Sequence, residues 1–326
     1  MRIPRRHQFD PVDPPWLHCV SRCVRRAFLC GDGYEHRKEW LERRLRLLAR
    51  CFAVEVGGFA LLSNHAHLVV RPRPQQTSTW SAAEVVRAWW HVRRNVDPVD
   101  DPTVAPDHAQ IDVLAQDADF VARWRERLGS LSWFMKELRE PLSRQANRED
   151  DCTGAFWEGR FSSKPLLDKA AIVTCMAYVD LNPIRAQLAL TPESSAHTSV
   201  ALRIATRDAP DRVDWLVPVP EMTSTQAGDP GLSLAAYLEL VDCTGRGVRA
   251  GKRGAIPAEL PQILPRIAPD LDPATWLATQ GRPRSLLGTA LGGLDALRRE
   301  AQRRSKRWLQ QRCALFMAPS RRAGVC

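Results

Sequence analysis

Two apolar runs separated by a two-residue link constrain the fold of this chain most strongly. The runs are Val54–Leu62 and His65–Val70, and Ser63–Asn64 lies between them. Two such runs with so short a polar link predict an antiparallel hairpin. The chain therefore contains a sheet, and Pro72 and Pro74 are expected to end it, because proline cannot donate to a strand ladder.

The patterns around this hairpin predict the other elements of the sheet. A strand is expected at Trp16–Cys23 and an amphipathic helix at Tyr34–Phe52, where apolar residues recur at steps of three and four. Another strand is expected at Phe156–Leu167, followed by a helix at Asp168–Leu181 that opens with a good N-cap. With the helical stretch between them, this order is typical of an α+β fold: a ferredoxin-like split βαβ antiparallel sheet with one extra helix packed on it.

Two details of the helical regions can also be predicted. Pro141 is expected to kink or split the stretch Phe120–Asn147, because proline removes an intrahelical hydrogen bond. The arginines of the Tyr34–Phe52 helix are expected to form a solvated outer face; they are Arg43, Arg44, Arg46 and Arg50.

A change of composition near residue 200 predicts the domain organisation. Residues 1–200 are expected to form one domain with a helical insert at about 75–150. Residues 201–326 are expected to form a mostly helical, basic extension whose role the sequence does not define. Helices are predicted at Leu232–Asp242 and within Leu286–Met317, which contains the basic run Arg303–Trp308.

The charge and the cysteines narrow the class of protein. A net charge of +10 favours a polyanionic partner such as nucleic acid, although arginine used for ordinary surface charge would give the same balance. The nine cysteines are an odd number without paired Cys-x-x-Cys clusters, and the N-terminus has no apolar signal segment. We therefore expect free thiols in a reducing cytoplasm. No apolar stretch is long enough to predict a membrane span.

The hairpin carries the first candidate for chemistry, His65-Ala66-His67. Side chains at i and i+2 of a strand point to the same face, so two imidazoles about 7 Å apart at the backbone would project together. Such a pair suits Zn, Mn, Fe, Ni or Co, and it also suits Mg²⁺ or Mn²⁺ if oxygen ligands complete the site. By itself the motif is weak, and two solvated or hydrogen-bonded histidines are the alternative.

The helix before Pro183 carries the second candidate. Tyr178 is one of three tyrosines, and Asn182 lies four residues later on the same helical face. A phenol and an amide oxygen can therefore face one point. The alternative is a core tyrosine, with Asn182 serving as a helix C-cap.

Taken in order, four motifs resemble one family. They are SRCVRRAFLC at Ser21–Cys30, GFALLSNHAHLVV at Gly58–Val70, FWEGRF at Phe156–Phe161 and CMAYVDLNPIRA at Cys175–Ala186. The set resembles the HUH-type Y1 transposases of the IS200 kind, and more closely their REP-associated tyrosine transposase relatives.

The resemblance implies a metal-dependent single-strand DNA transposase that cleaves and rejoins DNA through a 5′-phosphotyrosine intermediate. His65 and His67 would be the metal pair, Tyr178 the nucleophile and Asn182 the third metal ligand. The cofactor would be Mg²⁺ or Mn²⁺. The substrate would be single-stranded DNA with hairpin or palindromic repeats, and a monomer is favoured over a homodimer.

The expected DNA contacts are basic residues near the active face of the family fold; they are Arg22, Arg25, Arg26, Arg160, Lys164 and Arg185. Trp157 and Phe161 would either stack on bases or belong to the core. Two alternatives to the enzyme stay open. One is a catalytically inactive relative that grips hairpin DNA, and the other is an RNA-binding protein with a similar sheet.

Overall fold

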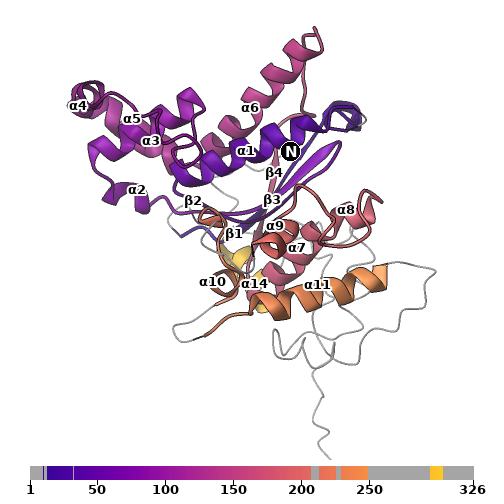
Figure 1. Ribbon diagram of the computed structural model, residues 1–326. Helices are drawn as coiled ribbons and strands as arrows, with labels where there is room; N and C mark the ends of the chain where they lie inside the picture. Colours follow the sequence, from indigo (N-terminus) through magenta and orange to yellow (C-terminus); the bar gives the residue numbers. More distant parts are fainter. Residues whose placement is uncertain are drawn as a thin grey trace, which may run out of the picture.

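The computed structural model of the protein describes residues 10, 13–31, 33–206, 213–224, 229–248 and 294–303. At its centre lies a four-stranded sheet in the order β2-β3-β1-β4, with every pairing antiparallel (Figure 1). The strands are β1 (Trp16–Arg22), β2 (Val54–Leu61), β3 (His65–Pro72) and β4 (Ser162–Leu166). This order confirms the predicted α+β, ferredoxin-like arrangement.

The β2–β3 hairpin divides its side chains between the two faces of the sheet. In the hairpin register Ala60 lies opposite His67 and Leu61 lies opposite Ala66. Because alternate residues of a strand point to opposite faces, Ala66 and Leu68 enter one core. Val69 enters the second core, together with Ala60. The two histidines of β3 therefore belong to the face of the second core.

Helix α1 and the insert after β3 cover the first face (Figure 1). The helices are α1 (His36–Cys51), α2 (Gln76–Thr79), α3 (Ala82–Arg94), α4 (His108–Ala115), α5 (Ala118–Leu128) and α6 (Leu131–Glu149). Their starts follow from local caps: Ser81 and Glu84 form a capping box on α3, and Asp117 caps α5. Gly129 and Ser130, rather than Pro141, separate α5 from α6.

The expected solvated arginine face of α1 is wrong for Arg44, which is buried between α1 and the insert. It is also wrong for Arg50, whose side chain is 11% exposed and pairs with Asp97 and Asp214. The Arg44 guanidinium donates to the carbonyl oxygen of Val92 and pairs with the Glu137 carboxylate. The same arginine explains why α6 continues through Pro141. The carbonyl of Glu137, which a proline ring nitrogen cannot bond, accepts a hydrogen bond from Arg44 Nε at 3.0 Å.

The predicted strand Phe156–Leu167 is correct only in its second half. Before Ser162 the chain makes a single bridge, between Trp157 and Cys23, and passes through Gly159 at φ 139°. Few side chains other than glycine tolerate that backbone conformation, so the ladder cannot extend further back.

The second face is covered by α7 (Lys169–Asp180) and the helices after it. These are α8 (Asn182–Arg185), α9 (Ser199–Ala205), α10 (Val219–Thr223) and α11 (Leu234–Val248). Nearly all of α7 is buried, because the sheet lies on one side and α10 and α11 contact the other. Asp168 caps α7 as predicted, by accepting from the backbone of Ala171.

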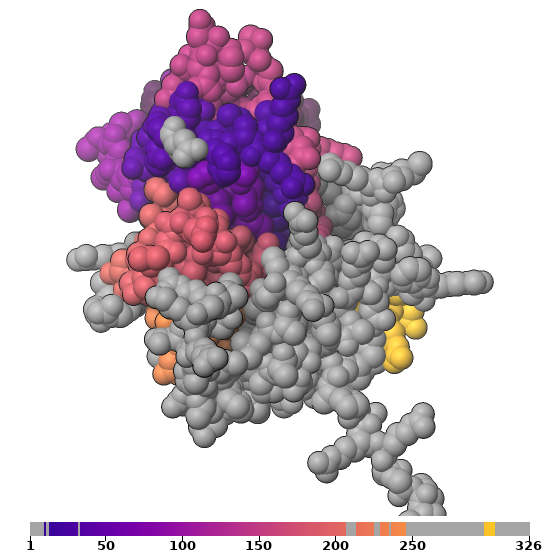
Figure 2. All heavy atoms as spheres, turned by 90° about the vertical axis from the view of Figure 1, so that its right-hand side faces the viewer, coloured from indigo at the N-terminus to yellow at the C-terminus, as the bar shows by residue number. Residues whose placement is uncertain are grey.

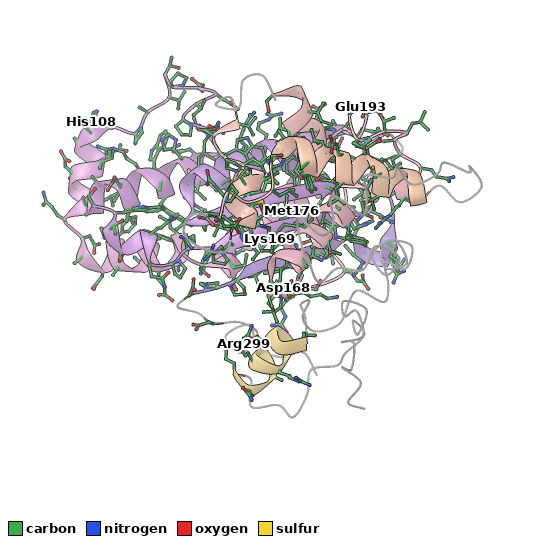
Figure 3. The ribbon with its side chains drawn as sticks, turned by 90° about the horizontal axis from the view of Figure 1, so that it is seen from below. His108, Asp168, Lys169, Met176, Glu193 and Arg299 are labelled. Carbon is green, nitrogen blue, oxygen red and sulfur yellow. The ribbon has the colours of Figure 1, made fainter. Side chains whose placement is uncertain are left out.

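The extension joins this second core. Tyr237 and Leu240 of α11 are fully buried in it, and the domain boundary near residue 200 stays a prediction. Helix α14 (Leu294–Arg303) lies near the start of α7, where Leu297 packs against Leu167 (Figure 3). Beyond Arg303 the predicted basic run lies outside the described residues. No described helix is long and apolar enough to cross a membrane.

Candidate active site

Strand β3 and helix α7 bring His65, His67 and Tyr178 together on the second face of the sheet. The imidazole rings of His65 and His67 lie 4.8 Å apart between centroids. The Tyr178 ring lies 5.6 Å from the His67 ring and meets it edge-on. The metal pair and the nucleophile expected from the sequence are therefore neighbours, although a long insert and a strand separate them along the chain.

The hydrogen bond at Nδ1 of each imidazole determines whether its Nε2 carries a lone pair that could bind a metal. His65 Nδ1 lies 2.5 Å from the side-chain oxygen of Asn64, which can only accept, so Nδ1 carries the proton and Nε2 the lone pair. His67 Nδ1 lies 2.9 Å from His18 Nε2. His67 Nε2 is buried and has no hydrogen-bond partner among the described residues. An orphaned imidazole nitrogen beside a second lone pair fits a metal ligand pair.

His18 is the functional candidate that the sequence analysis missed. It lies on β1, diagonally across from His67, since Val20 is the register partner of His67 and Val69 that of His18. Its ring is stacked on the His67 ring at 5.1 Å and lies 6.0 Å from the Tyr178 ring. A histidine between two apolar residues of the predicted strand, at the same parity as Arg22, was the available signal.

Burial keeps all three imidazoles neutral. It lowers the pKa of His18 to about 3, helped by the charges of Lys164 and Arg22. Burial, with Arg22 and Arg26, lowers the pKa of His65 to about 4. The pKa of His67 is lowered well below its ordinary value, mainly by burial. A neutral ring is the form that binds a metal, so these rings are ready to bind at neutral pH.

Several predicted DNA contacts surround these rings. Arg22 is the register partner of His65, and Lys164 that of His18. The guanidinium of Arg185 lies 4.9 Å from the centre of the Tyr178 ring. Burial lowers the pKa of Lys164 to about 8 and that of Arg185 to about 10. Arg22, Lys164 and Arg185 together form a cationic rim around the candidate nucleophile.

The turn after β1 places two further arginines beside the hairpin. Arg25 and Arg26 adopt the left-handed conformation, with φ of 53° and 58°. The turn is fastened to the β2–β3 link, because Asn64 donates to the Arg26 carbonyl and Cys23 donates to the Asn64 carbonyl. Both arginine side chains are exposed. Consecutive strained residues held by outside contacts are a frequent mark of a functional turn.

Arg160 lies elsewhere, in a groove between α6 and the segment before β4. The groove has a volume of about 450 Å³, and its basic lining residues are Lys136, Arg139, Arg144 and Arg160. Trp157 and Phe161 also line it but are mostly buried, and Trp157 donates to the Arg139 carbonyl. Their packing favours the core alternative over base stacking. On the face shown in Figure 2, the N-terminal residues (indigo) form a band between the insert and the segment that follows α7.

Asn182 begins α8, directly after α7, and is only 8% exposed. Its side-chain nitrogen donates to the Tyr178 carbonyl at 3.3 Å, as a helix-terminal cap would. A metal would require the other amide atom, Oδ1. The assignment of Asn182 as third ligand therefore stays a prediction.

A buried carboxylate fixes the end of α7 that carries Tyr178. Asp180 accepts hydrogen bonds from the Ser199 hydroxyl at 2.6 Å, from the backbone of Val200 at 3.1 Å and from the Tyr237 hydroxyl. Burial raises the pKa of Asp180, while these bonds and the charge of Arg203 act in the opposite direction. The helices α9 and α11 thus hold the last turn of α7 in place.

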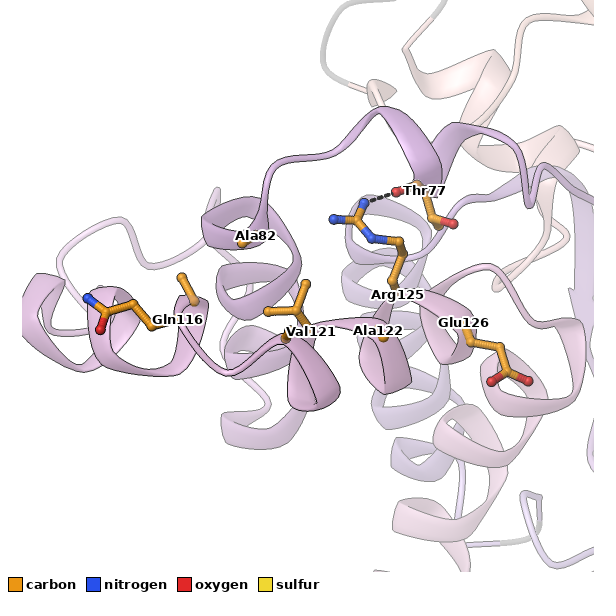
Figure 4. Close-up of a pocket in the computed structure, with 9 residues that line it drawn as sticks. Thr77, Ala82, Gln116, Val121, Ala122, Arg125 and Glu126 are labelled. Carbon is orange, nitrogen blue, oxygen red and sulfur yellow. Dashed lines mark hydrogen bonds between the residues drawn. The ribbon is translucent and has the colours of Figure 1, made fainter.

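A second hollow in the described part of the chain lies away from this site. A pocket of about 570 Å³ lies within the insert and is lined by residues that include Thr77, Val121 and Arg125 (Figure 4). None of the candidate residues lines it. No group of three or more His, Cys, Asp or Glu among the described residues could hold a metal, so His65 and His67 would need an oxygen ligand of another type.

Comparison with models of known protein families finds no match, and comparison with curated proteins finds none. Among solved structures, the chain is similar to a REP-associated tyrosine transposase bound to a REP hairpin, which belongs to the family that the motifs resemble. The two chains share 12% identity with a TM-score of 0.37, over 70% of this chain and 97% of the other. The function is accordingly argued from the site itself.

Proposed function

We propose that the protein is a metal-dependent enzyme that cleaves and rejoins single-stranded DNA, with Tyr178 as the nucleophile. The observation that carries this proposal is the contact between the rings of Tyr178 and His67. The Nε2 atom of His67 is buried and has no protein partner among the described residues. A hydrophobic core would not leave an imidazole nitrogen without a partner beside a phenol, because an unsatisfied buried polar atom costs about 1–3 kcal/mol. A metal would remove that cost.

The proposed metal ligands are His65 and His67 through Nε2 and Asn182 through Oδ1. When bound, Mg²⁺ or Mn²⁺ would stabilise the charge that builds on the phosphoryl and leaving oxygens. Two nitrogen ligands make this donor set softer than an all-oxygen site, so Mn²⁺ should support activity at least as well as Mg²⁺.

In the proposed step the Tyr178 oxygen forms a bond to phosphorus while the bond from phosphorus to the 3′-oxygen breaks. The phenol loses its proton, and the leaving oxygen takes one up to become a 3′-hydroxyl. The product is a 5′-phosphotyrosine, which keeps the energy of the phosphodiester bond. Another 3′-hydroxyl can therefore reverse the step and join strands without ATP. The guanidinium of Arg185 lies over the Tyr178 ring, where its charge can interact with the phosphate that the tyrosine would attack.

The arrangement of cations supports DNA as the substrate. Arg22, Lys164 and Arg185 lie around the reactive face, where they can contact phosphates on both sides of the cleaved bond. The basic groove that contains Arg160 lies apart from this face, and the segment that lines it is tied to the end of β1, because the backbone of Glu158 donates to the Arg22 carbonyl. We propose that a hairpin stem lies along this groove.

The proposal is tested by trapping the covalent intermediate. A pool of single-stranded oligonucleotides, each with an imperfect hairpin and randomised flanks, is labelled at the 3′ end and incubated with the protein and Mn²⁺. We expect a protein–DNA adduct that survives SDS, an unlabelled fragment that ends in a 3′-hydroxyl, and loss of both on adding EDTA. Binding of the hairpins without adduct or fragment would instead support the inactive, hairpin-gripping relative.

The role of the cations is tested by the salt dependence of binding. Arg22→Gln is expected to weaken the binding of an uncleaved single strand about tenfold. It should also reduce the slope of log K against log salt by about 0.7, the value for one lost phosphate contact. The matched control is Arg94→Gln on α3, an exposed arginine outside the site, which should leave both quantities unchanged. An equal loss in the two variants would show that only net charge matters.

A further inference from the structure

His18 is buried against the candidate metal ligand His67 and forms a hydrogen bond with it. Its ring is 1% exposed, and its Nε2 lies 2.9 Å from Nδ1 of His67, on the side of the ring away from the orphaned Nε2. The planes of the two rings are nearly parallel, at 15° to each other. His18 is therefore placed to act on the orientation and the proton of His67.

Only two proton arrangements make this hydrogen bond between neutral rings. In the first, His67 Nδ1–H donates to His18 Nε2, and His67 Nε2 carries a lone pair. In the second, His18 Nε2–H donates to His67 Nδ1, and the proton on His67 Nε2 is buried without an acceptor among the described residues. The second arrangement leaves a buried donor unsatisfied, whereas the first leaves a lone pair available for a ligand.

We propose that His18 is a positioning residue that holds His67 as the Nδ1–H tautomer, so that the Nε2 lone pair faces the metal. This inference deepens the proposed function and rests on it for the identity of the ligand. Outer hydrogen bonds of this kind fix the tautomer and orientation of metal-binding histidines.

The tautomer is measured first, in the metal-free protein, by long-range ¹H–¹⁵N NMR of the histidine rings. We expect the wild-type His67 ring to carry its proton on Nδ1. In His18→Gln the amide oxygen can replace the acceptor at Nε2, so His67 should keep this tautomer. In His18→Leu, which has a similar volume and no acceptor, no hydrogen bond selects the Nδ1–H form, so a measurable Nε2–H population should appear.

The metal is measured second, by titration with Mn²⁺ monitored by electron paramagnetic resonance. His18→Leu should bind Mn²⁺ about 10- to 100-fold more weakly than wild type, the usual cost of losing such a partner. His18→Gln should stay within about threefold of wild type. The metal-free melting temperature of His18→Leu is expected to fall, because Nδ1 of His67 is left buried without its hydrogen-bond partner.

These readouts separate the inference from the proposed function. An unchanged tautomer in His18→Leu, or equal Mn²⁺ affinity in His18→Leu and wild type, would overturn the role of His18 even if the protein cleaves DNA. A wild-type protein that forms no adduct, yet shows the expected tautomers and affinities, would overturn the nuclease proposal and support the role of His18.

Discussion

Replacement of Tyr178 by phenylalanine is expected to abolish the protein–DNA adduct and to reduce strand cleavage by a factor on the order of 10⁴ or more. The variant keeps the ring that lies against His67 and Arg185 and lacks only the oxygen that would bond to phosphorus. DNA affinity and Mn²⁺ affinity should stay within about twofold, because neither depends on that oxygen in the proposed mechanism. Cleavage and binding are measured on the same labelled hairpin strand.

The chain offers a matched control for this substitution. It contains three tyrosines, and Tyr34 is the exposed one, at 38%. Tyr34→Phe keeps the ring that lies against Arg37 and should form the adduct at the wild-type rate. Peptide mapping of the wild-type adduct by mass spectrometry should place the nucleotide on Tyr178. An adduct that persists in Tyr178→Phe would assign the nucleophile to another residue.

Replacement of Asp180 by alanine is expected to lower the free energy of unfolding by about 3–5 kcal/mol. The carboxylate accepts from Ser199, Val200 and Tyr237 at once. Without it Val200 and Tyr237 would lose this buried acceptor, and Ser199 would keep only the Phe59 carbonyl. Arg203, also buried, would lose a neighbouring negative charge. Urea denaturation of the metal-free protein, followed by circular dichroism, measures the change.

Two further variants calibrate this effect. Tyr237→Phe removes one of the three bonds and should cost about 1 kcal/mol. Asp112→Ala, at an exposed position on α4, should change stability by less than about 0.5 kcal/mol. Asp180→Ala should also cleave DNA more slowly at temperatures where it is folded, because Tyr178 lies on the turn that Asp180 anchors. A loss no larger than that of Asp112→Ala would contradict the anchoring role.

The sheet and its candidate pair could be predicted because they follow from local patterns. The hairpin is encoded by two apolar runs and a short link, and the shared face of His65 and His67 follows from the alternation of a strand. The order of strands along the chain was enough to favour the observed topology. Local patterns alone do not predict that Tyr178 lies beside these histidines. The family motifs suggested it, and the packing of α7 on the second face brings it about.

What could not be predicted depends on partners that are distant in the sequence. The sequence predicts that Arg44 is solvated, because its partners Glu137 and Val92 lie far away in the insert. Pro141 reads as a helix breaker until Arg44 supplies a donor for the carbonyl that the proline ring leaves unbonded. His18 reads as a histidine within an apolar strand until the pairing of β1 with β3 sets it beside His67.

The division of β3 between two cores has a consequence for how reliably the site forms. A slip of β3 by one residue would turn His65 and His67 into the apolar layer beneath α1 and would turn Leu68 and Val70 toward the cationic rim. Such a misfolded sheet would bury two imidazoles among aliphatic side chains, so it would be unstable as well as inactive. The most stable register of the sheet is thus also the one that places both imidazoles beside the tyrosine.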